Sequence, residues 1–191
     1  MGVEIERRFL VFGQGWKGEE TESIPLRDGL VAVGWGRKVR VRIAGDRATL
    51  TVKGPRRGLR RSEFEYEIPL ADAECMLAEL CRRPGQVTEK TRHIIPAGDL
   101  KWEVDVYHGL LSGVTTAEIE LPSAATAFAR PDWLGPEVSG DLRFTVRQMV
   151  RDRLLRSWAA GLLPVVRRLG RRMRHRLRPA RTGRGFPDPR R

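Results

Sequence analysis

The amino-acid sequence predicts a mainly β protein with helices, an α+β fold whose centre is an eight-stranded antiparallel closed barrel with flanking helices. The first observation is a strict alternation of apolar and charged residues in short segments, which is the period of a β-strand. The second is the placement of Gly-Asp turns at positions 45–46 and 98–99, which predict hairpins. The third is the even number of segments, because eight antiparallel strands can close and leave no exposed edge.

The expected strands follow this alternation from the N-terminus onward. In the first segment Glu4, Glu6 and Arg8 share one face, and apolar residues take the other. A polar connection at 13–28, rich in glycine, separates it from the second segment. Strands are expected at residues 2–11, 30–33, 38–43, 47–53, 61–69, 87–95, 100–107 and 117–121.

Two segments change to the helical spacing of three and four residues. The first covers residues 71–82 and is stopped by Pro84 and Gly85. The second covers residues 144–160, after a loop at 131–141, and ends at Gly161. Its apolar stripe consists of Val146, Met149, Val150, Leu154 and Trp158.

The charge is distributed unevenly and divides the chain into residues 1–160, which form the globular domain, and residues 161–191. Residues 167–191 hold eleven Arg and one Asp, and so carry +10 of the formal net charge of +12. This segment predicts a basic amphipathic helix followed by an Arg-rich tail. Its expected partners are nonspecific nucleic acid, polyphosphate or an anionic membrane, and compositional drift is the alternative. The apolar stripe is Leu162, Val166, Leu169, Met173 and Leu177.

The remaining features predict a cytoplasmic protein without a transmembrane segment. No apolar run approaches the length of a membrane span, and the N-terminus carries charges where a signal peptide needs an apolar region. Cys75 and Cys81 lie on different faces of the expected helix, which argues against a disulfide. The sequence leaves the oligomeric state open, a homodimer included.

The polar faces of the strands carry like charges, grouped strand by strand. A solvent-facing sheet is the simple interpretation, but it would usually mix in more Thr, Ser and Gln. Ions inside a closed barrel cost several kcal/mol each unless partners compensate them. A wet interior that binds a polyanion and metal ions would supply those partners, because carboxylates suit Mg²⁺, Mn²⁺ or Ca²⁺ and arginines suit phosphate oxygens. The carboxylates are Glu4, Glu6, Glu63, Glu65, Glu67, Glu103, Asp105, Glu118 and Glu120, and the cations are Arg8, Lys38, Arg40, Arg42, Lys53, Arg61, Lys90 and Arg92.

An ordered set of motifs over residues 1–155 resembles the CYTH superfamily, the triphosphate tunnel metalloenzymes, and within it the small bacterial inorganic triphosphatases. The segment that begins at Glu4, Glu-Ile-Glu-Arg-Arg-Phe-Leu-Val, is similar to the ExExK signature of that superfamily. The further matches follow in the same order. They are Pro25-Leu-Arg-Asp-Gly, Val39-Arg-Val-Arg, Leu50-Thr-Val-Lys, Glu63-Phe-Glu-Tyr-Glu-Ile, Glu89-Lys-Thr-Arg, Trp102-Glu-Val-Asp-Val, Ala117-Glu-Ile-Glu and Trp133-Leu-Gly-Pro-Glu-Val.

The resemblance implies metal-dependent hydrolysis of inorganic tripolyphosphate, or of an organic triphosphate, inside a charged barrel. It implies Mg²⁺ or Mn²⁺ as the metal, with two ions bound. The catalytic residues would be Glu4, Glu6 and Lys90, and Arg61, Glu63 and Glu65 would support the interior. Metal ligation would fall to Glu4, Glu6, Asp105, Glu118 and Glu120, and binding of the triphosphate or polyphosphate substrate to Arg8, Arg40, Arg42, Lys53, Lys90 and Arg92.

Val146 stands where a polar residue is common in the family, and three other departures from the family pattern keep a second hypothesis open. Arg8 replaces the Lys of ExExK, Lys38 replaces an acidic residue, and Leu30 replaces a Tyr. They favour, as the alternative, a catalytically weak or inactive module that binds triphosphate or polyphosphate without turnover. The superfamily also contains adenylyl cyclases and thiamine triphosphatases, which are a further alternative.

Overall fold

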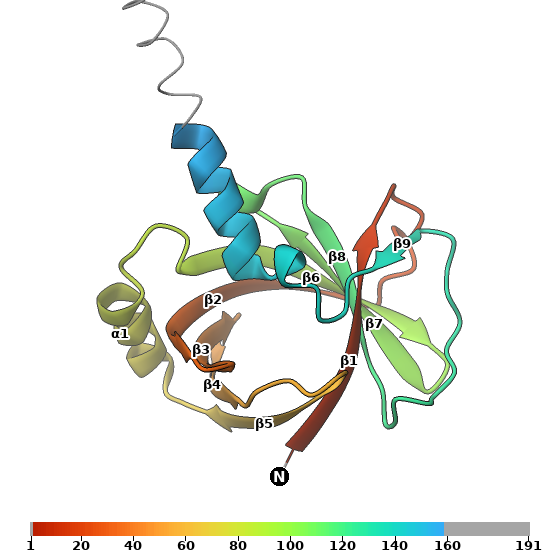
Figure 1. Ribbon diagram of the computed structural model, residues 1–191, viewed down its shortest axis with the longest axis horizontal. Helices are drawn as coiled ribbons and strands as arrows, with labels where there is room; N and C mark the ends of the chain where they lie inside the picture. The colour runs from red at the N-terminus through yellow and green to blue at the C-terminus, as the bar shows by residue number, and fades with distance from the viewer. Residues whose placement is uncertain (1, 159–191) are drawn as a thin grey trace, which may run out of the picture. The chain divides into compact units, whose positions relative to one another are not determined.

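The computed structural model describes residues 2–158, and the basic segment predicted at 161–191 lies outside them. Nine strands and two 3-10 turns are present among the described residues, together with helix α1 (Leu70–Leu80) and a helix at residues 146–158 (Figure 1). The strands are β1 (Gly2–Val11), β2 (Glu22–Gly34), β3 (Arg37–Ala44), β4 (Arg47–Lys53), β5 (Arg60–Glu67), β6 (Val87–Ala97), β7 (Leu100–Tyr107), β8 (Thr115–Glu120) and β9 (Leu134–Glu137).

The strands close into the expected antiparallel barrel. The order is β5-β4-β3-β2-β6-β7-β8-β1, and β1 also pairs with β5, which completes the ring seen in Figure 1. Strand β9 is an addition that pairs with β1 outside the ring. The prediction of a mainly β, eight-stranded closed barrel with flanking helices is therefore confirmed, with one extra strand.

Strand β2 is longer than the sequence predicted, because it begins at Glu22 and not at residue 30. Residues 22–28 were expected to belong to the connection. Instead residues 22–29 pair along their whole length with β6, from Glu22 opposite Ile94 to Gly29 opposite Val87. Pro25 is tolerated because β3 does not begin to pair until Leu26, so at Pro25 only one side of β2 is hydrogen-bonded.

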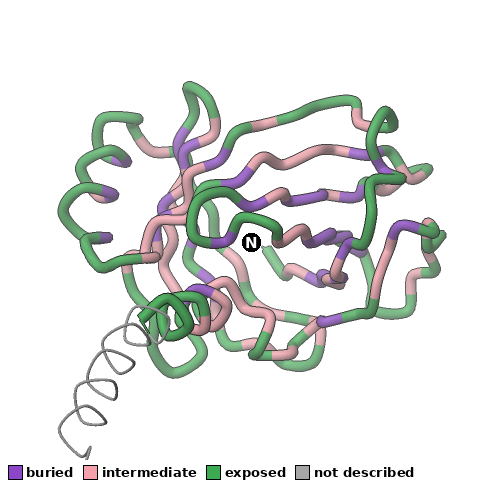
Figure 2. Tube along the Cα trace, turned by 90° about the horizontal axis from the view of Figure 1, so that it is seen from above, coloured by how far each residue is buried: buried purple, intermediate pink, exposed green. Residues whose placement is uncertain are grey.

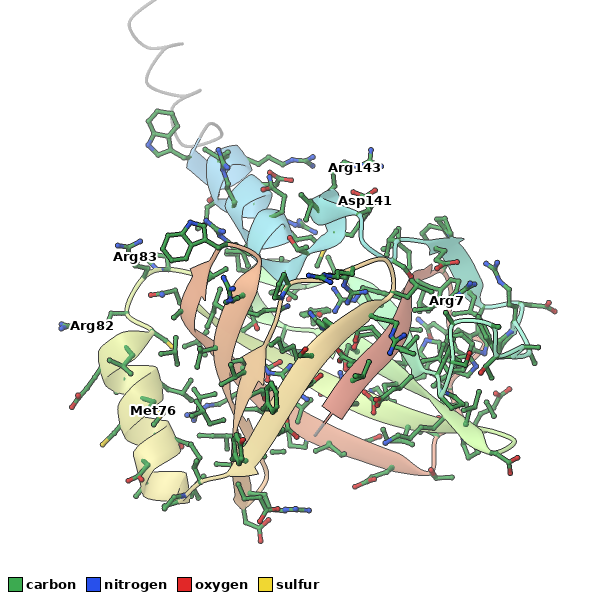
Figure 3. The ribbon with its side chains drawn as sticks, turned by 60° about the horizontal axis from the view of Figure 1, so that its bottom comes forward. Arg7, Met76, Arg82, Arg83, Asp141 and Arg143 are labelled. Atoms are coloured by element: carbon green, nitrogen blue, oxygen red, sulfur yellow. The ribbon has the colours of Figure 1, made fainter. Side chains whose placement is uncertain are left out.

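Helix α1 covers the outer surface of β2, β3 and β4. Val41 and Ile43 pack there against Ala73 and Leu77 of the helix, with Met76 at the edge of the contact (Figure 3). The helix approaches Gly29 so closely that a Cβ atom at this position would lie 2.3 Å from Leu77 Cδ2. A larger residue at position 29 would have to displace the Leu77 and Cys81 side chains, so packing favours glycine here.

A second apolar cluster lies on the outer face of β1, β6, β7 and β8. Phe9 and Trp102 are almost fully buried in it, at 0% and 1% exposure, and Phe128 and Trp133 from the segment after β8 pack edge-on against Trp102. Figure 2 shows the buried residues recurring along the strands, whereas the turns are exposed. The apolar faces of the strands thus point outward under other segments, which leaves the charged faces to point inward.

The helix at 146–158 begins two residues later than predicted. A 3-10 turn, Leu142–Phe144, precedes it, and the Asp141 side chain accepts a hydrogen bond from the Arg143 backbone N–H (Figure 3). Val150 packs against Tyr107 and Leu111, which ties the start of this helix to the end of β7. Neither described helix is long and apolar enough to cross a membrane.

Candidate active site in the barrel interior

The inner face of β1 carries the carboxylates of the first motif, and each of them meets cations from other strands. Lys53 Nζ of β4 lies 2.8 Å from a Glu4 oxygen, and Arg61 of β5 contacts the other Glu4 oxygen. Arg61 also donates to Glu6 over 2.9 Å, and Arg56 from the loop between β4 and β5 contacts Glu6 as well. Glu4 and Glu6 therefore contact cations from three separate segments: β4, β5 and the loop between them.

Arg8 continues this face and is partly buried. Its guanidinium pairs with Glu118 of β8, which stands opposite it in the β1–β8 register. The Arg8 backbone N–H donates to Ser139 Oγ over 3.0 Å. Arg8 Nη1 lies 3.5 Å from the Phe144 carbonyl oxygen. Phe144 belongs to the 3-10 turn before the helix at 146–158, so a segment outside the barrel strands also contacts Arg8.

Strands β6 and β7 place a second group of ions in the interior. Arg92 donates to both oxygens of Asp105 over 2.8 Å each, and it lies 3.4 Å from Glu118. Lys90 also pairs with Asp105, and its ammonium lies 5.6 Å above the Tyr107 ring. Asp105 is completely buried, with both oxygens engaged, so it holds two predicted phosphate-binding cations in place.

The paired arginines of β3 are held by a carboxylate that the sequence analysis did not single out. Asp28 of β2 accepts from Arg42 Nε over 2.6 Å and from Arg42 Nη2 over 2.9 Å. Asp28 also lies 3.6 Å from Lys90 Nζ and 3.9 Å from Arg40. Once 22–34 is known to be one strand, Asp28 falls on the inner face by alternation, so the missed strand explains the missed residue.

The predicted supporting residues lie beside the same cations. Glu63 of β5 is 2.8 Å from Lys53 Nζ, so this lysine is held between Glu4 and Glu63. Glu65 is 3.6 Å from Arg40 and accepts a 2.7 Å hydrogen bond from the Thr51 hydroxyl. Together with Asp28, the residues that sequence reasoning missed are Arg56 and Thr51.

The electrostatics divide the carboxylates into two groups, one with a lowered pKa and one with a raised pKa. Burial opposes ionisation of Glu118, but Arg8 and Arg92 hold its pKa well below the usual range. Burial likewise opposes ionisation of Glu4, yet Arg61 and Lys53 lower its pKa. By contrast, burial and the neighbouring carboxylates raise the pKa of both Glu6 and Glu120. Burial also lowers the pKa of Lys90, against the attraction of Asp105.

The carboxylates whose pKa is raised, Glu6 and Glu120, are of the right chemical type for a hard divalent cation. Glu6 and Glu120 stand directly opposite each other in the β1–β8 register, and Glu118 lies on the same face of β8 two residues away. Burial is the main cause of the raised pKa of Glu6 and Glu120, and repulsion from neighbouring carboxylates adds to it; a divalent cation would offset that repulsion. Within residues 2–158 no three acidic, histidine or cysteine side chains already converge on one point, since Glu4 and Glu118 contact Lys and Arg.

The arrangement is suited to binding a polyanion. Guanidinium and ammonium groups from five strands, β1, β3, β4, β5 and β6, face one interior, where carboxylates separate them and fix their orientation. Arginine forks bind phosphate oxygens bidentately, and a low-dielectric interior strengthens such contacts. The predicted phosphate-binding residues are thus brought together, and so are Glu4, Glu6, Glu118 and Glu120 of the predicted metal set.

Comparison with known proteins gives matches over the same residues. The CYTH domain family model matches residues 2–145. The chain is 40% identical over 152 residues to an inorganic triphosphatase of Acetivibrio thermocellus, covering 80% of this chain and 96% of the relative. It is 36% identical over 149 residues to an inorganic triphosphatase of Nitrosomonas europaea, covering 74% of this chain and 93% of the relative. A crystal structure of an inorganic triphosphatase matches with a TM-score of 0.53 and 33% identity, over 78% of this chain and 95% of the other.

Proposed function

The chain belongs to the CYTH domain family, and we propose that it hydrolyses inorganic tripolyphosphate in the barrel interior. In this reaction a water oxygen attacks a terminal phosphorus while the bond from that phosphorus to its bridging oxygen breaks. The products are orthophosphate and diphosphate. The observation that carries the proposal is the convergence of Arg8, Arg42, Lys90 and Arg92 on one interior, each oriented by a carboxylate.

The cations of the interior bind the substrate and stabilise the charge that develops on it. Arg42 and Arg92 offer N–H groups in fixed directions, because Asp28 and Asp105 hold them bidentately. Phosphoryl transfer depends on positioning and on electrostatic stabilisation of the phosphoryl oxygens, so pre-oriented donors lower its barrier. Lys90, deeply buried beside Asp105, neutralises charge on a phosphate oxygen at the centre of the group.

Glu4, Glu6, Glu118 and Glu120 would hold Mg²⁺ or Mn²⁺, with two ions as the proposed number. Such ions, when bound, neutralise phosphate charge and lower the pKa of a coordinated water. Burial and the neighbouring Glu118 raise the pKa of Glu6, so a bound divalent cation would favour the ionised carboxylate that metal ligation and catalysis require. Asp105 also belongs to the predicted metal set. Its Oδ1 accepts from Arg92 and its Oδ2 accepts from both Arg92 and Lys90, so in this structure it contacts cations of the protein.

Phosphate release from tripolyphosphate tests the proposal. Wild-type protein should release phosphate with Mg²⁺ or Mn²⁺ and none after chelation. Glu118→Gln should reduce kcat/KM by about 100-fold or more, because removal of one preorganised electrostatic group costs at least that much. Glu137→Gln, which alters an exposed carboxylate that pairs with Arg7 outside the barrel, should leave the rate unchanged. No release with any divalent metal from folded protein would contradict the proposal.

Binding without turnover is a second candidate, and one observation favours it. The position that is Lys in the ExExK signature is Arg8, whose guanidinium is paired with Glu118 and does not give up a proton. This candidate predicts that calorimetry shows metal-assisted binding of tripolyphosphate while the ligand is recovered intact. Phosphate release measured with ATP and with thiamine triphosphate distinguishes both candidates from the hydrolysis of an organic triphosphate. The proposed tail contacts, a homodimer and a cytoplasmic location stay predictions.

A further inference from the structure

Lys38 differs from the other inward-facing cations of the barrel strands because it has no carboxylate partner. It lies on the inner face of β3 in series with Arg40 and Arg42, and it is partly buried. Arg42 pairs with Asp28, and Arg40 lies within 4 Å of Asp28 and Glu65. Within residues 2–158 Lys38 makes neither an ion pair nor a side-chain hydrogen bond, whereas Arg8, Lys53, Arg61, Lys90 and Arg92 each make at least one.

The surroundings of Lys38 make this lack of a partner costly. Lys38 stands directly opposite Lys53 in the β3–β4 register, and cross-strand like charges destabilise a sheet. Lys53 shares its ammonium between Glu4 and Glu63, so those carboxylates do not serve Lys38. Burial, together with repulsion from Arg61, Lys53 and Arg8, lowers the pKa of Lys38 to about 8. A partly buried ammonium that repels its neighbours and has three free donors is suited to bind an anion from outside the chain.

The position of Lys38 along β3 indicates which part of a substrate it would meet. Alternate residues of a strand are roughly 7 Å apart, so Lys38 lies roughly 14 Å along the strand from Arg42. Arg42 belongs to the buried group around Asp28, Lys90 and Asp105. Lys38, by contrast, is the second residue of β3, next to the hairpin that joins β2 to β3. It therefore serves the end of a phosphate chain and not its centre.

We propose that Lys38 binds the outermost phosphate of tripolyphosphate and thereby selects triphosphate over diphosphate. The proposal rests on the proposed function, since it takes the interior to be the tripolyphosphate site. A diphosphate bound at Arg42, Lys90 and Arg92 ends before it reaches Lys38. A tripolyphosphate extends along β3, and its terminal oxygens accept hydrogen bonds from the Lys38 ammonium and neutralise the only unpaired cation in this series.

Calorimetric titration of both ligands in the presence of Mg²⁺ tests the selection. Lys38→Met should weaken tripolyphosphate binding by about tenfold to a hundredfold, the range expected for a lost hydrogen bond to a charged group. Its affinity for diphosphate should change by less than about threefold, and Lys38→Arg, which keeps the charge, should retain most of the tripolyphosphate affinity. Lys17→Met, at an exposed lysine that contacts Gln14, is the matched control and should bind both ligands like the wild type.

Thermal unfolding of the same variants separates a binding role from a structural one. Lys38→Met should not lower the melting temperature without ligand, because it removes a repelled charge and no partner. A loss of stability, or equal weakening for both ligands, would overturn the assignment to Lys38. If the wild type binds tripolyphosphate but does not cleave it, the hydrolysis proposal fails while the test of Lys38 stands. If the wild type binds neither ligand, both proposals fail.

Discussion

Replacing Asp28 by Asn should destabilise the protein more than any conservative change at its surface. The Asp28 carboxylate accepts two hydrogen bonds from Arg42, at 2.6 and 2.9 Å, and lies 3.6 Å from Lys90. Burial opposes its ionisation, but Arg42 and Lys90 hold its pKa far below the usual range. Removing one partner of a buried ion pair costs about 3–5 kcal/mol. Asn keeps one oxygen acceptor for Arg42, so we expect about 3 kcal/mol, or about 6–12 °C in Tm for a unit of this size.

Urea and thermal unfolding followed by circular dichroism measure this loss. Asp99→Asn, in the exposed turn between β6 and β7, is the matched control and should stay within about 0.5 kcal/mol of the wild type. A second readout is ligand rescue: tripolyphosphate should raise the Tm of Asp28→Asn more than that of the wild type, because the anion compensates the cations left by the substitution. A loss below about 1 kcal/mol would show that Asp28 does not hold Arg42 as the structure indicates.

Three further predictions concern metal, pH and the basic segment. Glu120→Gln should raise the Mg²⁺ or Mn²⁺ concentration needed for half-maximal activity by about tenfold, while substrate affinity at saturating metal changes little; an unchanged metal requirement would remove Glu120 from the ligand set. The pKa of Lys38 is about 8 in the folded protein, below its unfolded value of 10.5. The charged ammonium therefore destabilises the fold at neutral pH, and this loss of folding free energy disappears as pH rises from about 8 to 10.5. Lys38→Met should therefore be more stable than the wild type at pH 7, by about 1 kcal/mol after allowance for solvent screening, and the two should converge near pH 10.5, whereas a gap that is constant with pH would contradict the reasoning. Deleting residues 169–191 should lower nonspecific nucleic-acid affinity in a salt-dependent manner without reducing phosphate release, and unchanged affinity would dismiss a nucleic-acid role for that segment.

Alternation alone was enough to predict the inward face of the barrel, but not the partners on it. Glu4, Glu6 and Arg8 were placed together because strand geometry dictates it. The pairing of Glu4 with Lys53, 49 residues away, depends on closure of the barrel through β1 and β5, which no local pattern encodes. Asp28 was missed because Pro25 and Gly29 favour a turn locally, whereas pairing with β6 and packing against α1 override that preference.

At Lys38 the sequence predicts a departure from the family pattern but not its consequence. The consequence depends on which side chains surround the lysine, and these are known only from the structure. In the sequence, Lys38 is one of the departures that favour binding without turnover, since a cation stands where an acidic residue is common. In the structure this lysine faces Lys53 and Arg61 without a carboxylate of its own. Lys38, which in the sequence favours a loss of turnover, is therefore a candidate for selecting triphosphate over diphosphate.

The distribution of charge and apolar surface argues that the interior is maintained for ligand binding and not for stability. The apolar clusters around Trp102 and Val41 lie on the outer faces of the barrel strands. Together with the cluster that joins Tyr107 to Leu111 and Val150, they supply the hydrophobic stabilisation of the described fold. Buried ion pairs add little to this, because desolvation offsets their attraction, and packed apolar residues of similar volume would serve stability as well or better. A barrel with an interior of Arg, Lys, Asp and Glu is therefore no more stable, and can be less stable, than one with a packed apolar interior. Binding a highly charged phosphate chain is the function that makes such an interior useful, since only pre-oriented cations bind it without reorganisation during the reaction.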